Sequence, residues 1–292
     1  HQPKYYYFAW ANRLVTYYLK TSRTNIALYE VQNMLKEAQK EDDKTGLSRC
    51  YNIMSQIYTI KRFDSMAFEW RLKEIELTEK YNIENYNISQ TYAQIANYYI
   101  SQKKQKEALR AVEKAISTAN SSTQQISAKL EYVNYYSKFG DFQAAEKILK
   151  ECQIAFEQDK RLESIKKRLY NIECLYYQQT RQYQKALEAA EMQEKEEHRL
   201  SESILSSSHY RTQGEIYQKM GNMNMAVKYL QMYINTDDSL KIANEQVASS
   251  EFATLLNVEK LNAEKKELML QAQEKELHNK TTLIISLIIL LG

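Results

Sequence analysis

Glycine and proline are scarce in this chain of 292 residues, which contains 5 Gly and 1 Pro. Average proteins contain about 7% glycine and about 5% proline. All-β folds place these residues at most of their turns, and parallel α/β folds use glycine between strands and helices. Their scarcity argues against both classes and predicts an all-α fold of long helices joined by short polar turns.

A concentration of charge of one sign is also missing. The chain has 40 Lys and Arg and 37 Asp and Glu, which are interspersed and give a net charge of +3. A domain that binds duplex DNA usually gathers its basic residues in one stripe. We therefore expect no direct nucleic-acid partner for this segment.

Cysteine is rare as well, and its three copies follow no metal-binding spacing. Cys50, Cys152 and Cys174 are far apart in the sequence. An odd number of cysteines in a large helical chain does not indicate a disulfide framework. We expect all three to be small buried hydrophobic side chains.

Tyrosine, in contrast, is abundant, with 24 copies in a chain that is 43% hydrophobic. A tyrosine buries its ring while its hydroxyl stays near water. This composition favours a thin, extended core with much half-buried surface.

The clearest motif spans residues 210 to 226. Tyr210 is followed by Gly214, Tyr217, Gly221 and Ala226. We expect Gly214 and Ala226 to let two antiparallel helices cross closely, with Tyr217 beside the crossing. Gly221 can adopt the positive φ that ends the first helix. This order resembles the tetratricopeptide repeat, a unit of two antiparallel helices.

Five further segments show the same order of residues. Their members are Leu14, Val15, Tyr18, Ala27 and Val31; Cys50, Met54, Ile57, Phe63 and Met66; Tyr92, Ile95, Ala96, Tyr99 and Ala108; Tyr132, Val133, Tyr136, Gly140 and Ala145; and Tyr170, Cys174, Tyr177, Tyr183 and Ala186. In the second of these segments the alignment can slip by one residue, toward Tyr58 and Ala67. With Met66, the second-helix positions are 39, 42, 37, 41 and 40 residues apart. The period of about 40 exceeds the usual 34 of the family, which implies longer helices.

The resemblance implies a right-handed α-α superhelix in which stacked helix pairs supply the core. We expect about six pairs over residues 5–236, a long capping helix over 237–280 and an apolar segment over 281–292. The polar run at 235–238 favours a helix start. The residues expected to pack this helix on the sixth repeat are Leu240, Val247, Phe252, Leu255 and Leu256.

The long helix carries a partial heptad pattern. Leu256, Ala263, Leu270 and Leu277 are seven residues apart, but the positions three residues later are polar. A coiled coil needs both positions to be apolar. A homodimer through this helix and a solvated single helix therefore both remain open.

The last residues of the chain carry no charge and are strongly apolar from Leu283 to Leu291. A membrane span needs about 20 apolar residues, so the simplest interpretation of 281–292 is a transmembrane helix cut short by the end of the chain. A hydrophobic tail that docks in a groove is the alternative. An array, a charged helix and a membrane entry together resemble the extracytoplasmic sensor region of bacterial membrane-anchored signalling proteins. That resemblance implies periplasmic repeats and a histidine kinase or DNA-binding regulator domain inside the cell.

The first helix of each pair lines the concave face of such arrays, and we expect a protein or peptide ligand there. The positions after the small residue are Thr16, Ser55, Asn97, Asn134, Leu175 and Glu215. The positions one turn earlier are Asn12, Tyr51, Ala93, Leu130, Asn171 and Arg211. The amides of Asn97 and Asn134 offer both donors and acceptors to a peptide backbone, although an exposed Asn is often only solvated. Ala93 and Leu130 stand where a clamp for an acidic tail would need lysine.

Residues for catalysis or for a cofactor are not evident. The histidines at 1, 198, 209 and 278 do not have metal-binding spacing, and no phosphate-binding or nucleophile motif is present. We expect a non-enzymatic sensor that relays ligand state through its C-terminal helix. The alternatives are a passive scaffold for protein complexes and a cytoplasmic regulator that responds to a peptide.

Overall fold

The computed structural model describes the backbone of residues 3–200 and 207–291, and the side chains of 8–196 and 207–278. Within these ranges all regular structure is helical, which confirms the all-α prediction. The helices are α1 (Pro3–Lys20), α2 (Thr24–Lys40), α3 (Lys44–Ile60), α4 (Asp64–Tyr81), α5 (Ile88–Ser101), α6 (Gln105–Ser117), α7 (Ser122–Phe139), α8 (Phe142–Gln158), the 3-10 helix η1 (Lys160–Ile165), α9 (Lys166–Gln179), α10 (Tyr183–Leu200), α11 (Ser208–Lys219) and α12 (Met223–Leu291).

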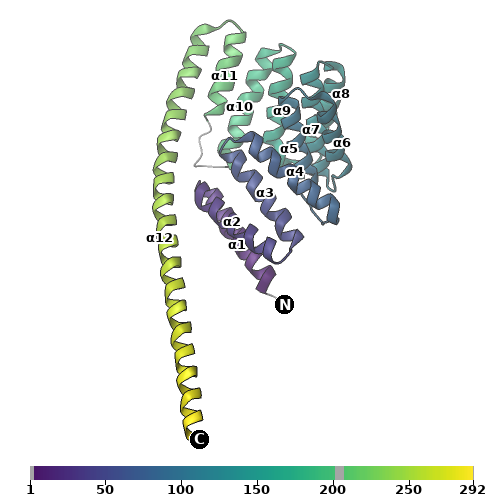
Figure 1. The fold of residues 1–292 in the computed structure, drawn as a ribbon. Coiled ribbons are helices and arrows are strands. Elements are labelled where there is room, and N and C mark those ends of the chain that lie inside the picture. Colours follow the sequence, from purple (N-terminus) through teal and green to yellow (C-terminus); the bar gives the residue numbers. More distant parts are fainter. Residues whose placement is uncertain (1–2, 201–206, 292) are drawn as a thin grey trace.

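Consecutive helices pack as six antiparallel pairs, from α1 with α2 to α11 with α12 (Figure 1). The first helices of neighbouring pairs also pack on each other, α5 on α7 and α7 on α9, whereas no comparable contact joins the second helices α6 and α8. In these middle pairs the first helices therefore form the inner layer of the array and the second helices form the outer layer. The predicted stack of about six helix pairs is confirmed.

The repeat register is marked by a left-handed residue at the end of each first helix. These residues are Ser22, Arg62, Lys103, Gly140, Arg181 and Gly221. Five residues after each comes an alanine that is at most 2% exposed, at 27, 67, 108, 145, 186 and 226. Ala67 is fully buried whereas Met66 is 41% exposed. The slipped alignment of the second repeat is thus the correct one, and the spacings become 40, 41, 37, 41 and 40 residues.

The core is a chain of small clusters and not one central mass. Separate clusters form within the first two pairs, around α5 and α6, between α7, α8 and α9, and around α10 and α11. The three cysteines are buried in these clusters as free thiols, as the sequence predicts. A core this thin leaves many tyrosines half-buried, which accounts for their abundance.

Gly214 marks the closest approach of α11 to α12. A Cβ atom at this position would lie 2.8 Å from Cγ of Leu230 and 3.3 Å from its backbone nitrogen. The crossing predicted to involve Gly214 and Ala226 is therefore closest at Leu230, one helical turn beyond Ala226.

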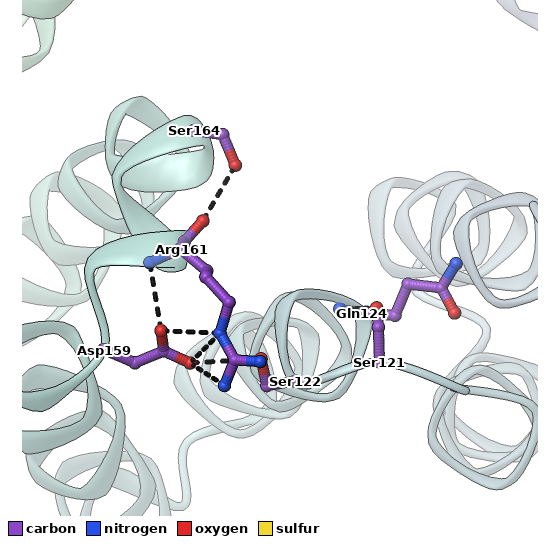
Figure 2. Close-up of polar contacts among 6 residues, drawn as sticks. All are labelled: Ser121, Ser122, Gln124, Asp159, Arg161 and Ser164. Carbon is purple, nitrogen blue, oxygen red and sulfur yellow. Dashed lines mark hydrogen bonds and ion pairs between the residues drawn. The ribbon is translucent and has the colours of Figure 1, made fainter.

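The junction between the fourth and fifth pairs is fixed by a polar cluster (Figure 2). The Asp159 carboxylate accepts hydrogen bonds from the backbone amide of Arg161 at 3.0 Å, from its guanidinium at 2.8 to 3.1 Å, and from Ser122 Oγ at 3.1 Å. These bonds lower the pKa of Asp159 to about 2. The backbone amide of Gln124 donates to Ser121, which caps α7. The cluster thereby ties the start of α7 to η1, which leads into α9.

The C-terminal helix differs from the prediction, because α12 is continuous over 69 residues and serves both as the second helix of the sixth pair and as the long extension. No break occurs at 235–238, where Asp237 accepts a hydrogen bond from Ser207 of the α10–α11 connection at 2.9 Å. A carboxylate engaged there does not cap a new helix. At 1.5 Å per residue α12 is about 100 Å long.

The extension of α12 makes little contact with the sixth repeat. Phe252 and Leu256, predicted to pack there, are 64% and 50% exposed, while Leu240, Val247 and Leu255 are half-buried. The helix instead passes α2, where Glu251 is buried (Figure 1). Residues 259–278 are all exposed, including Leu270 and Leu277 of the partial heptad. The homodimer stays a prediction.

The apolar segment 281–292 lies outside the described side chains. Among the residues that the structure describes, no helix contains an apolar stretch suited to crossing a membrane.

Candidate ligand-binding surface

The inner layer contains a cavity of about 370 Å³ near its N-terminal end, which we call the N-terminal cavity. It lies between α1, α3, α4 and the connection at 83–87. Polar side chains line most of it: Asn12, Thr16, Thr45, Ser48, Arg49, Asn52, Gln56, Glu74, Glu84, Asn85, Tyr86 and Asn87. A volume of this size lies at the lower end of the range for small-ligand pockets, about 300 to 1,000 Å³.

The N-terminal cavity exists because the stacking of first helices is interrupted there. In the middle of the array α5 packs directly on α7 and α7 on α9, but α3 makes no comparable contact with α5. The connection between α4 and α5 is longer than that between α2 and α3, and it begins at Asn82 with a left-handed φ of 47°. Figure 1 shows α3 running obliquely to α5 and the helices beyond it. The gap left by this change of direction forms the cavity.

A buried carboxylate lies at the floor of the N-terminal cavity. Glu74 is 1% exposed, and its oxygens accept hydrogen bonds from Asn52 Nδ2 at 3.2 Å and Asn85 Nδ2 at 2.9 Å. Thr91 Oγ1 lies within 3.4 Å. Burial raises the pKa of Glu74, and these three donors act in the opposite direction. The side chain joins α3, α4 and α5 at the point where their stacking is interrupted.

A second hollow of about 210 Å³, the central groove, lies over α5, α7 and α9. Three of the predicted ligand residues line it together: Asn97, Asn134 and Leu175. Asn134 Nδ2 donates to Asn97 Oδ1 at 2.7 Å. Among the contacts of the described residues, this leaves the Asn97 amide donor and the Asn134 carbonyl acceptor for a ligand. The structure thus brings these three residues together in one hollow.

The remaining predicted positions are distributed differently. Asn12 and Thr16 line the N-terminal cavity. Asn171 and Arg211 are exposed but border neither hollow, and Arg211 Nε donates to Glu215 at 2.8 Å. Their side chains lie on the surface of α9 and α11 without a described cavity beside them.

Four predicted positions face the interior. Ser55, Leu130 and Ala93 are at most 2% exposed, and Tyr51 packs against Trp70 with ring centroids 5.4 Å apart. Tyr51 and Ser55 were placed one residue out of register, because the second repeat was aligned on Met66. Leu130 and Ala93 lie one turn before the groove positions, where the side chains face the neighbouring helices and not the groove. The prediction that these four side chains point into an open groove is therefore incorrect.

Sequence reasoning missed Asn52, Gln56 and Glu74. Aligning the second repeat on Ala67 puts Ser55 at the small position, so that the same rule would have selected Gln56 and, one turn earlier, Asn52. Glu74 had no signal in the repeat pattern, because it lies on the second helix of its pair and enters the cavity only where α3 and α5 separate.

The described residues show no arrangement suited to catalysis by a thiol or a metal. Burial raises the pKa of Cys50 to about 12 and that of Cys152 to about 11, which keeps both thiols protonated. No group of three or more His, Cys, Asp or Glu residues within the described ranges could hold a metal ion. The chemistry that this surface offers is hydrogen bonding, packing and one buried carboxyl group.

No protein-family model matches the sequence, and no curated protein matches it either. Solved structures do resemble the fold. A tetratricopeptide repeat protein from Parabacteroides merdae is 15% identical with a TM-score of 0.55, covering 84% of each chain. The apo form of RapI is 15% identical with a TM-score of 0.62, covering 80% of this chain and 84% of that chain. NprR in complex with its cognate peptide NprX is 12% identical with a TM-score of 0.63, covering 84% of this chain and 69% of that chain.

At these identities the likeness establishes the fold alone. Together with the repeat register and the stacked inner layer, it defines the chain as a tetratricopeptide-like superhelical array.

Proposed function

We propose that this protein is a non-enzymatic array that binds a peptide, or an extended segment of a protein, on its inner layer. The observation that carries the proposal is the amide pair in the central groove. Asn134 and Asn97 bond to each other and leave one donor and one acceptor at the surface. A peptide bond offers the complementary acceptor and donor.

The surroundings of the amide pair favour a peptide over a highly charged small molecule. The central groove contains one charged side chain, Lys138, beside Ile100, Leu175 and several uncharged polar groups. Apolar and amide groups side by side suit a ligand that presents backbone and aliphatic side chains together. The resemblance to NprR, whose structure contains a cognate peptide, supports the same ligand class.

We further propose that ligand state is relayed through α12. This helix is continuous from the sixth pair to Leu291, and it contacts α2 of the first pair on its way. A ligand that changes the curvature of the inner layer would change the distance between the first and last pairs. A stiff helix transmits such a displacement, whereas a flexible linker would absorb it.

Capture of peptides from a synthetic pool tests the binding role. Five-residue peptides of random sequence are incubated with the purified chain, separated with it by gel filtration and identified by mass spectrometry. We expect a reproducible set of captured peptides. Replacing both Asn97 and Asn134 by Ala should weaken their binding about thirtyfold, because two lost hydrogen bonds cost about 1 kcal/mol each. The matched control is Gln143→Ala, an exposed amide on the outer helix α8. Failure to capture any peptide, or equal weakening by the control, would contradict the proposal.

The membrane-anchored sensor remains part of this proposal, with the repeats outside the cytoplasm. It is supported by the apolar sequence at 281–292 and by the long charged helix before it. Protease digestion of intact cells, with the periplasm opened selectively, distinguishes the locations. Cleavage of the repeats only after the outer barrier is opened supports a periplasmic array, whereas protection until the cells are lysed supports a cytoplasmic regulator.

A further inference from the structure

Three glutamates within the described residues are almost fully buried, and they differ in what compensates their charge. Glu131 is 1% exposed and forms an ion pair with Arg168, which joins α7 to α9. Glu251 is 2% exposed and binds backbone amides at the start of α2. Glu74 is 1% exposed and, among the described residues, receives hydrogen bonds only from neutral amide and hydroxyl groups.

The two cations nearest to Glu74 in the sequence are engaged elsewhere. Lys73, the adjacent residue, places its Nζ 4.2 Å from the centroid of the Trp70 ring. Arg71 lies one turn earlier on α4, but its guanidinium donates to Gln94 Oε1 at 2.7 Å and to Thr59 Oγ1 at 2.6 Å. The positive charge of Arg71 lowers the pKa of Glu74 less than the hydrogen bonds to that carboxyl do. A buried carboxylate without a direct cationic partner is costly. The fold therefore holds the Glu74 carboxyl without a direct ion-pair partner among the described residues.

Glu74 differs from the other two buried glutamates in a second respect, because it lines an open cavity. The charged residues of the N-terminal cavity are Arg49, Glu74 and Glu84, so that acidic groups exceed basic groups by one. The walls are otherwise amides and hydroxyls, which can accept the remaining N–H groups of a guanidinium or ammonium. The cavity volume of about 370 Å³ is sufficient for one long side chain and the backbone that carries it.

We propose that the N-terminal cavity is a specificity pocket for a lysine or arginine side chain of the bound peptide, with Glu74 as its countercharge. This inference rests on the proposed peptide-binding function and specifies where one side chain of the peptide binds. The cationic group lies among Asn12, Asn52 and Gln56 and supplies the positive partner that Glu74 lacks in the chain alone. Amide pairs such as Asn97 and Asn134 hold backbone, whereas the N-terminal cavity selects by charge.

The test uses a pool of five-residue peptides with acetylated and amidated ends, so that side chains carry the only charges. Peptides captured by the full chain should be enriched in Arg or Lys at one position. Captured peptides are then resynthesised with citrulline in place of arginine, which preserves shape and removes the charge. We expect citrulline to weaken binding at least about tenfold, because leaving a buried charge unpaired is costly. Glu74→Gln should abolish the difference between arginine and citrulline.

Two controls separate this effect from damage to the fold. Glu173→Gln changes a half-buried carboxyl that borders neither hollow, and it should keep the preference for arginine. Gln56→Lys places a positive charge at an exposed position of the cavity and should weaken arginine peptides selectively, without touching the Glu74 side chain.

The outcomes distinguish this inference from the function on which it rests. Captured peptides without enrichment in Arg or Lys, or a preference that survives Glu74→Gln and Gln56→Lys, would overturn the pocket assignment and leave peptide binding intact. Capture of no peptide at all would contradict both.

Discussion

Glu251 of α12 caps the N-terminus of α2 at Asn25, which is 226 residues earlier in the chain. Its Oε1 accepts from the backbone amides of Asn25 at 3.1 Å and Ile26 at 3.3 Å, and its Oε2 accepts from Asn25 Nδ2 at 2.7 Å. Arg23, the residue at the N-cap of α2, provides no side-chain cap. The first turn of a helix has free amides and a partial positive charge, both of which a carboxylate satisfies. The last helix thus completes the first pair.

Glu251→Ala should therefore release α12 from the first pair. Loss of a helix cap costs about 1 to 2 kcal/mol, and the buried amides of α2 would become open to water. We expect faster hydrogen exchange at Asn25 and Ile26 and lower stability in urea denaturation.

Glu259→Ala is the matched control, because this residue lies on the exposed part of α12. It should leave both measurements unchanged. Unaltered exchange at the start of α2 in the Glu251 variant would show that the contact does not hold the two ends together.

The left-handed turn at Lys103 predicts a stabilising substitution. Lys103 has a φ of 56°, at the position that Gly140 and Gly221 occupy in other repeats. An L-residue in this conformation destabilises the fold by roughly 1 to 2 kcal/mol. Glycine lowers stability only through the higher entropy of a more flexible unfolded chain. Lys103→Gly should raise the free energy of unfolding by about 1 kcal/mol, as measured by chemical denaturation.

The reverse substitution serves as the comparison. Gly140 has a φ of 90° and open space around its missing Cβ, so that Gly140→Ala tests backbone strain alone. It should lower stability by about 1 kcal/mol. If both variants moved stability in the same direction, the conformational argument would be wrong.

Gly214 tests packing and not backbone strain. An alanine Cβ here would meet both the side chain and the backbone of Leu230. Overpacking destabilises by about 1 to 3 kcal/mol, and the better helix propensity of alanine offsets about 1 kcal/mol of this. We expect Gly214→Ala to lower the melting temperature and Leu230→Ala in the same chain to recover part of the loss. A melting temperature that rises in the single variant would contradict the close approach of α11 and α12.

Glu173 predicts a dependence of stability on pH. Burial raises the pKa of its carboxyl, and a hydrogen bond from Gln153 at 2.6 Å opposes this. A carboxyl with a raised pKa in the folded state favours the protonated form there. Its ionisation therefore destabilises the fold above the raised pKa, and this cost disappears as pH falls toward the ordinary value of 4.5.

Glu173→Gln should accordingly be more stable than the unaltered chain at pH 7, and the difference should shrink as pH falls to about 4.5. Urea denaturation at a series of pH values measures it. A stability difference between the two chains that increased as pH fell would contradict the raised pKa of Glu173.

The amino-acid sequence was sufficient to predict the helical class, the repeat and most of its register. The signals used were scarce glycine and proline, small residues at core positions and a period near 40. Each is local or periodic, so it can be recognised without knowing which chain segments become neighbours. The error at Met66 shows the limit of this information. Met66 and Ala67 are adjacent, and only the burial of Ala67 decides between them.

The groove residues were partly predictable for the same reason. Asn97, Asn134 and Leu175 follow from the repeat register, and they meet because α5, α7 and α9 stack regularly. The N-terminal cavity required the tertiary structure, since it forms where α3 and α5 fail to stack. No periodic signal reports an interruption of that kind.

The sequence by itself determined that helix pairs form and that they nest through small side chains, because those properties depend on residues within one repeat. Only the tertiary structure decided which surfaces the pairs leave open and where the ends of the array meet. Glu74 and Glu251 have the same side chain, on α4 and α12. One lines a cavity and the other caps a distant helix, because the packing of the pairs brings different partners to each.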